Sequence, residues 1–400
     1  MNKLELQYSL EKIYKLSEDP HSIYTPFELC ENMINSIQYL NGDILVISNL
    51  EFLIILKTKG LDMNNIYYST SCELKKRVAV NLGVSLNNIL ELEYNKEVNI
   101  TANMKFDIII QNPPYNPNSL WKKFVEKGIE LLKDGGKMIA IHPDSWRIAS
   151  SHHKFHLKLK KHLSELHMLQ YFWAAEKVSV SVDWYVYNKE EQKECKVYYP
   201  NYDIENIDIS KIDRIHKFSQ NSIQLSILNK ISTHNYNNEI IIKKGWEEMN
   251  IPQVENGRYK QCGGNKNQLG WLTDKFTLTD SKTEHQLDNK IVIAYAGKPR
   301  PRYFSGKDEI GVFTGSYWLT DKINSNPDSI VLFLEHKMIW KLIYSLIDPE
   351  PGVWKPYGTP AMIPLWYLRE LKIENLYVKS EDELYKHFNL TEEEINWINN

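Results

Sequence analysis

Apolar and polar positions in the first half of the chain follow two alternating periods. Short apolar runs predict strands, and the segments between them carry apolar residues at helical spacing. Strands are predicted at 43–50, 65–70, 88–92, 106–110 and 137–142, and helices at 1–18, 27–39, 74–82 and 120–132. Strands that alternate with helices are typical of βαβ units and of a parallel sheet. The first half is therefore predicted to be an α/β domain.

The second half of the chain lacks this rhythm. From Cys195 onward, Asn, Tyr, Gly and Trp are scattered and the apolar runs are short. Helices are predicted at 212–231 and 328–346, strands at 239–243, 290–295 and 311–319, and a last helix after a capping box of Thr391 and Glu394. The charged stretch 189–194 is typical of a surface boundary. Two domains are therefore expected, 1–195 and 196–400, the second of mixed α+β structure.

A proline-rich loop follows the apolar run 106–110. Pro113 and Pro114 stiffen the backbone, and Asn112 before them is held extended at the tip of a buried strand. Open α/β sheets bind ligands at the carboxyl ends of their strands. The Asn112 side-chain oxygen and the Pro113 carbonyl can accept the two hydrogens of an amine or amide nitrogen, and Tyr115 offers a ring face for stacking. The loop is predicted to activate such a nitrogen; the alternative is an ordinary proline-rich turn.

The tetrapeptide Asn112-Pro113-Pro114-Tyr115 resembles the catalytic motif of amino-methyltransferases that use S-adenosylmethionine. Asparagine at its first position is similar to the N6-adenine DNA methyltransferases, whereas the N4-cytosine enzymes usually carry serine there. The order of motifs in 20–190 resembles that of the gamma-type enzymes. The resemblance implies a Rossmann-like α/β methyltransferase domain followed by a DNA-recognition domain. It also implies methyl transfer to N6 of an adenine flipped out of double-stranded DNA.

The cofactor motifs of this family have partial counterparts in the chain. Tyr24-Thr25-Pro26 resembles the opening gamma-type motif, which covers the methionine end of the cofactor; the alternative is a helix start with Thr25 as N-cap and Pro26 as first helical residue. The first strand leads into a turn without the glycines of the family pattern. Other candidate cofactor contacts are Ser48, Asn49, Glu51, Glu73 for the ribose (or as a helix cap), Glu93 or Glu91 for the adenine edge, and Asn112.

Aromatic and basic positions supply candidates for base stacking and DNA contact. The alternating pattern from Val178 resembles a late family motif that places Trp173, with Phe172 second, against the flipped base; either ring could instead fill the core. Lys154 and Lys158 belong to a basic stretch that could contact phosphates or form a solvated helix face. Further DNA contacts are predicted for a loop with Lys298, Arg300 and Arg302.

Composition sets the remaining expectations. The net charge of −3 requires any DNA surface to be local, and the four cysteines lack metal-ligand spacing and indicate a reducing compartment. Without a signal peptide or membrane-spanning run in the sequence, a cytoplasmic protein is expected. Its expected cofactor is S-adenosylmethionine, without a metal, and its partner double-stranded DNA, with a restriction endonuclease left open. The alternatives are a non-catalytic DNA-binding subunit, suggested by the glycine-free turn, and an amino-methyltransferase acting on RNA or a protein glutamine.

Overall fold

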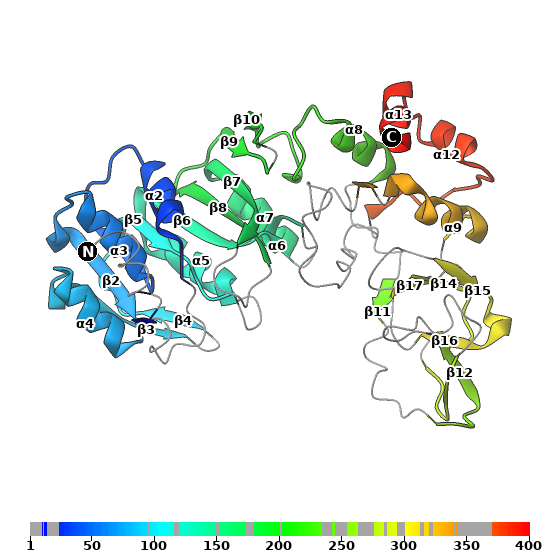
Figure 1. Cartoon of the computed structure of the whole chain (residues 1–400), viewed down its shortest axis with the longest axis horizontal. Coiled ribbons are helices and arrows are strands. Elements are labelled where there is room, and N and C mark those ends of the chain that lie inside the picture. Colours follow the sequence, from blue (N-terminus) through cyan, green and yellow to red (C-terminus); the bar gives the residue numbers. More distant parts are fainter. Residues whose placement is uncertain are drawn as a thin grey trace. The chain divides into compact units, whose positions relative to one another are not determined.

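The structure, a computed structural model, divides the chain into two compact units, Met1–Lys217 and Phe218–Asn400 (Figure 1). It describes residues 10, 12–13, 24–94, 97–115, 120–148, 152–172, 180–200, 202–233, 242–244, 254–262, 276–283, 286–293, 301–312, 316–319, 323–339, 341–342 and 370–400. None of the described helices is long and apolar enough to span a bilayer.

The described part of the first unit is built on a ten-stranded sheet in the order β10-β9-β7-β8-β6-β5-β1-β2-β3-β4. The strands are β1 Ile44–Ile47, β2 Ile66–Thr70, β3 Ile89–Tyr94, β4 Val98–Ile100, β5 Phe106–Gln111, β6 Leu132–Pro143, β7 Leu163–Phe172, β8 Val180–Asn188, β9 Glu194–Tyr198 and β10 Ile204–Asp208. Strands β3, β2, β1, β5 and β6 run parallel, and β8 is antiparallel to both β6 and β7. The parallel strands include all five that the apolar pattern predicts, with ends shifted by a few residues.

The order of the parallel strands reverses at β1. The chain passes from β1 outward to β2 and β3, and then returns to place β5 on the other side of β1. The carboxyl ends of β1 and β5 therefore form the topological switch point, where open α/β sheets bind ligands.

Helices cover both faces of this sheet. They are α2 Phe27–Asn35, α3 Leu50–Thr58, α4 Glu73–Asn81, α5 Leu120–Leu131, α6 Ser145–Ile148 and α7 His153–Lys160, with short 3-10 turns at Met63–Asn65 and Leu86–Asn88. Leu45 and Ile47 of β1 pack in one apolar cluster with residues of α5 and α7, whereas Ile44 and Val46 pack in another with α2, α3 and α4. Alternate residues of β1 thus face opposite cores, as a strand covered on both sides requires.

The first unit extends to Lys217, beyond the boundary expected at 195/196. β9 pairs with β7, and β10 pairs with β9, so the chain after 195 widens the sheet. Polar bonds hold the next segment: Lys160 Nζ donates to the Ile209 carbonyl at 3.0 Å, and Arg147 Nη1 donates to the Ile215 carbonyl at 3.2 Å. The charged stretch 189–194 therefore leads from β8 to β9, two strands of the same sheet that both pair with β7, and does not link the two units.

The second unit has mixed α+β structure. Its described strands form a four-stranded sheet, β11-β17-β14-β15, and a three-stranded sheet, β13-β12-β16. The elements are α8 Ile223–Ile231, β11 Ile242–Lys244, β12 Tyr259–Cys262, β13 Thr277–Thr279, β14 Lys290–Ile293, β15 Arg302–Phe304, a 3-10 turn Gly306–Asp308, β16 Ile310–Val312, β17 Ser316–Leu319, α9 Pro327–Glu335, α12 Glu381–His387 and α13 Glu392–Asn399. The capping box predicted at the start of the last helix is confirmed, because Thr391 and Glu394 exchange hydrogen bonds.

Candidate functional site

Two loops leave the sheet at the switch point. Ile47 lies opposite Gln111 in the ladder, so the next residues, Ser48 and Asn112, leave the carboxyl edge at the same level. Asn112 is 2% exposed, and Pro113, Pro114 and Tyr115 are also buried. The predicted catalytic loop therefore begins at the edge where ligands are expected.

Asn112 is fixed through two of its polar groups. Its backbone N–H donates to Asn49 Oδ1 at 2.9 Å, and its side-chain Nδ2 donates to Thr25 Oγ1 at 2.9 Å. Its side-chain oxygen, Oδ1, is buried and has no hydrogen-bond partner among the described residues. Leaving a buried acceptor unbonded destabilises a protein by about 1–3 kcal/mol, so Oδ1 is available to accept from a ligand donor or from ordered water.

Thr25 does not cap the helix that follows it. Pro26 occupies the N-cap position of α2, which begins at Phe27, and no side chain caps this end. The sequence interpretation with Thr25 as N-cap and Pro26 as first helical residue is therefore wrong. Thr25 is completely buried, and its N–H donates to Glu51 Oε1 at 2.5 Å while its hydroxyl oxygen accepts from Asn112. The Thr25 hydroxyl thus bonds Asn112, which is distant in sequence, and does not cap α2.

Ser48 takes the place of a glycine in the turn after β1. Its φ of 68° lies in the left-handed region that serine rarely adopts. Its N–H donates to the Ser69 carbonyl at 2.8 Å, and its carbonyl accepts from the buried Lys75 Nζ at 3.2 Å. The glycine-free sequence thus still forms a left-handed turn, held at both ends by hydrogen bonds.

Two more buried polar atoms lie at this edge, Ser69 Oγ on β2 and Gln111 Oε1 on β5. Neither has a hydrogen-bond partner within the described chain. Both residues flank Ile47 of β1 in the ladder. Buried polar atoms in proteins are nearly always bonded to protein or to ordered water. The Gln111 side chain packs beside β6, because its Nε2 donates to Met138 Sδ at 3.1 Å, so of these two atoms Ser69 Oγ is the candidate for contact with a ligand.

The two carboxylates expected to contact the nucleoside lie on neighbouring elements. Glu73 is the first residue of α4, which follows β2, and its exposed carboxylate lies 3.9 Å from Lys76 and 3.6 Å from Arg77. Glu93 is exposed on β3 and lies opposite Asn99 of β4. Glu91 is level with Thr70 at the carboxyl end of β2. None of these carboxylates belongs to the hydrogen bonds that join Thr25, Glu51, Asn49 and Asn112.

The aromatic candidates are only partly described. Tyr115 is 6% exposed and packs in the cluster with α2 and α3, and burial raises the pKa of its phenol well above the usual value. Phe172 is the last residue of β7, opposite Val180 in the ladder. Trp173 lies outside the described residues, and Tyr24 is half-buried just before Thr25.

The basic candidates belong to different elements. Lys154 and Lys158 are exposed on α7, whereas Lys160 of the same helix is buried against carbonyls of the segment that follows β10. Arg302 is half-buried on β15, with its guanidinium carbon 5.1 Å from the centre of the Phe304 ring. Lys298 and Arg300 lie outside the described residues.

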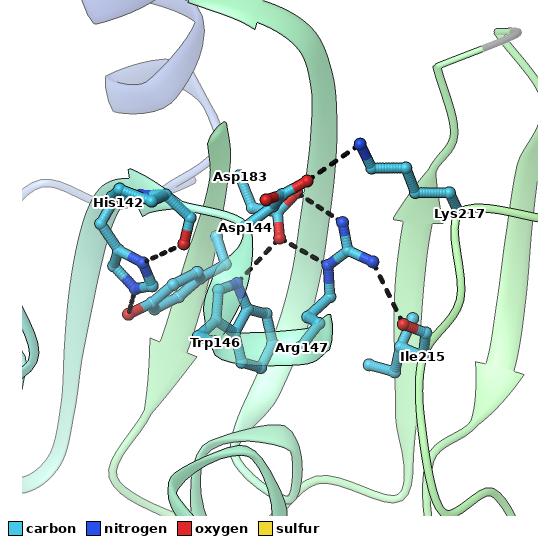
Figure 2. Close-up of polar contacts among 9 residues, drawn as sticks. His142, Asp144, Trp146, Arg147, Asp183, Ile215 and Lys217 are labelled. Carbon is cyan, nitrogen blue, oxygen red and sulfur yellow. Dashed lines mark hydrogen bonds and ion pairs between the residues drawn. The ribbon is translucent and has the colours of Figure 1, made fainter. Parts of the chain in front are cut away.

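A buried charge network at the carboxyl end of β6 was not anticipated from the sequence (Figure 2). Asp183 accepts from Arg147 Nε at 2.5 Å, from Arg147 Nη2 at 3.0 Å and from Trp146 Nε1 at 2.8 Å. Nearby, Lys217 Nζ lies 2.9 Å from Asp144. The one signal of this network in the sequence is Asp183, an acidic residue within the apolar pattern of β8. Its partner Arg147 lies 36 residues away, so no local pattern links the two.

His142 lies beside this network and is neutral. Burial lowers its pKa to about 3. Its Nδ1–H lies 3.1 Å from the Pro143 carbonyl, so Nε2 is left to accept from the Tyr185 hydroxyl at 2.9 Å (Figure 2). Trp121 stacks on its ring with centroids 4.3 Å apart. These contacts fix the end of β6, the strand that pairs with β5 ahead of the Asn112 loop.

The sheet order and the switch-point loops define a Rossmann-like methyltransferase domain of the class that uses S-adenosylmethionine. Residues 40–178 match the model of a family described as Eco57I restriction-modification methylase. This stretch contains strands β1 to β7 and both loops of the switch point. The matched region is thus similar to restriction-modification methylases.

Several solved structures are similar to the chain. A type I restriction-modification methyltransferase subunit from Streptococcus thermophilus is 16% identical, with a TM-score of 0.36 over 44% of this chain and 47% of that one. A putative class I S-adenosylmethionine-dependent methyltransferase from Listeria monocytogenes is also 16% identical, with a TM-score of 0.37 over 48% and 70%. The type IIL enzyme MmeI in complex with DNA is 10% identical, with a TM-score of 0.42 over 78% and 62%. The chain spans about half the length of the type I subunit. No curated protein matches the chain.

The residues at the switch point fit S-adenosylmethionine, which carries amino, carboxylate, hydroxyl and adenine groups. Ser48 supplies the left-handed backbone that a glycine usually supplies in such a turn. Asn112 Oδ1 and Ser69 Oγ offer buried polar atoms without partners among the described residues. Glu73 follows the carboxyl end of β2, where carboxylates of related folds bind the ribose, and Glu91 lies on β3 level with Thr70.

Proposed function

We propose that this protein is a DNA methyltransferase that transfers a methyl group from S-adenosylmethionine to N6 of an adenine in double-stranded DNA. The observation that carries the proposal is the buried Oδ1 of Asn112 at the switch point, which no described residue hydrogen-bonds. An acceptor fixed by Thr25 and Asn49 is suited to an amine that must be held by its hydrogens. The match of residues 40–178 to restriction-modification methylases supports DNA as the substrate.

The protein's task is to prepare the amine. The exocyclic nitrogen of adenine is a poor nucleophile because its lone pair is delocalised into the ring. Asn112 Oδ1 and the Pro113 carbonyl would accept its two hydrogens, which localises the lone pair and moves the nitrogen toward tetrahedral geometry. S-adenosylmethionine supplies the electrophilic methyl group, and Ser48, Glu51, Glu73 and Glu93 are its proposed contacts, together with Tyr24 and Pro26 on either side of Thr25.

The target base must leave the duplex to reach this loop, because its amine is engaged in pairing. Tyr115 and Trp173, with Phe172 as second candidate, are the proposed stacking partners of the extruded adenine. Stacking of one base on an aromatic ring contributes about 1–3 kcal/mol. This offsets part of the free energy that unpairing and unstacking require.

The second unit is proposed to recognise the target sequence. Arg302, with Lys298 and Arg300, would contact phosphates or base edges, and Lys154 and Lys158 of the first unit would contact the backbone. A restriction endonuclease is a proposed partner of such a methyltransferase. A non-catalytic role, suggested by the glycine-free turn, has less support because Ser48 adopts the conformation of the missing glycine.

Methyl transfer by Asn112→Ala tests the proposal. Labelled S-adenosylmethionine and genomic DNA from a host without adenine methylation are incubated with the protein, and digested DNA is analysed for N6-methyladenine. The substitution is expected to lower turnover by about 10²–10³-fold, a loss typical of removing one group that stabilises a transition state. DNA affinity should change little, because the contact strengthens mainly as the nitrogen changes geometry.

The control is Asn99→Ala, an exposed asparagine on β4 of the same unit, which should leave turnover unchanged. Near-normal turnover by Asn112→Ala would refute the assignment of the loop. RNA and glutamine-containing peptides serve as competing substrates, and preferential labelling of either would move the reaction to another substrate class.

A further inference from the structure

Asn49 occupies a helix-capping position without acting as a cap. It is the N-cap residue of α3, with extended backbone angles of −111° and 110°, yet its side chain makes no capping bond to its own helix. Asparagine at this position ordinarily accepts from its own helix and stabilises it by about 1 kcal/mol. Here its Oδ1 accepts instead from the backbone N–H of Asn112, 63 residues away, at 2.9 Å. The Asn49 side chain thus bonds the loop that carries Asn112 and leaves the first turn of α3 without a side-chain cap.

A second route from the same helix reaches the side chain of Asn112. Glu51 in the first turn of α3 accepts from the Thr25 N–H at 2.5 Å. The Thr25 hydroxyl oxygen accepts from Asn112 Nδ2 at 2.9 Å. All four residues are at most 2% exposed, so water does not compete freely for these bonds. One helix end therefore fixes Asn112 at its backbone directly and at its amide through Thr25.

These two contacts constrain where the free acceptor points. Rotation of the Asn112 side chain would break the bond to Thr25, and movement of its backbone would break the bond to Asn49. Misplacement of a reacting group by about 1 Å can lower the rate about 10²-fold. A loop held at two points by a buried helix keeps the acceptor in place before the substrate arrives.

We propose that Asn49 is a positioning residue for Asn112, and that Asn49 and Thr25 together set the direction of its Oδ1. Both residues were expected to contact the cofactor. In this proposal they act instead on the group that holds the target amine, and so link the cofactor-side segments to amine activation. The inference rests on the proposed role of Asn112 in methyl transfer.

The decisive experiment compares Asn49→Ser with Asn49→Asp in the full-length protein. Serine is a good N-cap but is too short to reach Asn112, whereas aspartate keeps an acceptor at the right distance. We expect Asn49→Ser to lower kcat about 10–100-fold with the Kd of S-adenosylmethionine, measured by calorimetry, within about threefold of normal. Asn49→Asp should restore most of kcat. The matched control is Asn326→Ser, at a conventional cap of α9 where the side chain bonds its own helix.

Thr25→Val and Thr25→Ser form the second pair and keep the inference testable if Asn49→Ser fails to fold. Valine has the shape of threonine but lacks the acceptor, so kcat should fall, and serine should restore it. A weaker cofactor Kd with kcat unchanged would overturn the inference and make these residues cofactor ligands. Unchanged kcat in both Asn49→Ser and Thr25→Val would overturn it as well. These failures differ from failure of the proposed function, in which Asn112→Ala itself keeps its turnover.

Discussion

The left-handed turn at Ser48 leads to a prediction of opposite sign for two substitutions. Ser48→Gly should stabilise the first unit, and Ser48→Val should destabilise it. The reason is the φ of 68°, a conformation that glycine adopts freely and β-branched residues almost never adopt. The turn is held at both ends, by the bond of Ser48 N–H to the Ser69 carbonyl and by that of Lys75 to the Ser48 carbonyl. The strain therefore cannot relax without loss of these bonds.

The magnitude follows from two opposing contributions. A left-handed residue other than glycine destabilises the folded state by about 1–2 kcal/mol, which Ser48→Gly removes. Glycine also adds freedom to the unfolded chain, which offsets about 0.4–1 kcal/mol. The net gain is between about 0 and 1.6 kcal/mol, or up to about 6 °C in melting temperature at about 2–4 °C per kcal/mol. Ser48→Val should lose about 1–3 kcal/mol through strain.

Hydrogen exchange of peptides that cover β1 and β2 measures this effect within the first unit. Ser69→Gly is the matched control, because Ser69 lies inside β2, where glycine is expected to destabilise by about 0.5–1 kcal/mol. Calorimetry of S-adenosylmethionine binding to Ser48→Gly completes the test, since a turn that acts through its backbone should keep its affinity. Faster exchange in Ser48→Gly, or tolerance of Ser48→Val, would refute the reasoning.

Two ion-pair sites give further predictions. Lys133 Nζ lies 2.7 Å from Asp107 and 3.0 Å from Asp43; burial alone would raise the pKa of Asp107, but the bonds from Lys133 and the Asp43 backbone lower it. The stabilisation from ionised Asp107 is present above its unfolded pKa of about 3.9 and is lost as the pH falls through its folded pKa. Lys133→Met should therefore lower the free energy of unfolding by at most about 1 kcal/mol at pH 7, measured by denaturant titration, and this loss should vanish in acid. Arg147→Met should lower the free energy of unfolding by about 3–5 kcal/mol, because it leaves Asp183 buried without its cation. Adding Asp183→Leu should recover most of this loss, and a double variant whose loss equals the sum of the two single losses would contradict the reasoning.

The parts of the fold that the sequence predicts are those with a strong local pattern. The isoleucine run of β5 is too short and too apolar to be anything but a buried strand, and the prolines after it end the strand. The helical spacing of α5 and the capping box of Thr391 are local in the same sense. The switch point follows from these local elements, because alternating strands and helices leave few topologies.

The rest depends on contacts between residues distant in sequence. Thr25 is a candidate helix cap from the sequence, and Asn49 occupies the N-cap position of α3, yet the side chain of each bonds Asn112 and caps no helix. The left-handed turn at Ser48 could not be predicted from the sequence, because such turns are recognised by glycine and this one contains none. β9 and β10 are missed because a charged turn precedes them, and only their pairing with β7 shows that they extend the sheet.

Helix α3 explains how the site tolerates an unpaired buried acceptor. Its residues Leu50–Leu56 are all buried, so the helix is enclosed by the core rather than lying on the surface. An enclosed helix moves less than a loop, and the side chains at its first turn therefore reach Asn112 from fixed points. Asn112 Oδ1 has no partner in the part of the chain that the structure describes, and leaving a buried acceptor unbonded costs about 1–3 kcal/mol. The bonds of Asn112 to Thr25 and Asn49 prevent its side chain from turning toward another donor. In the proposed reaction a substrate N–H would pair with Oδ1 and recover this free energy, so a rigid α3 would favour substrates that carry an amine.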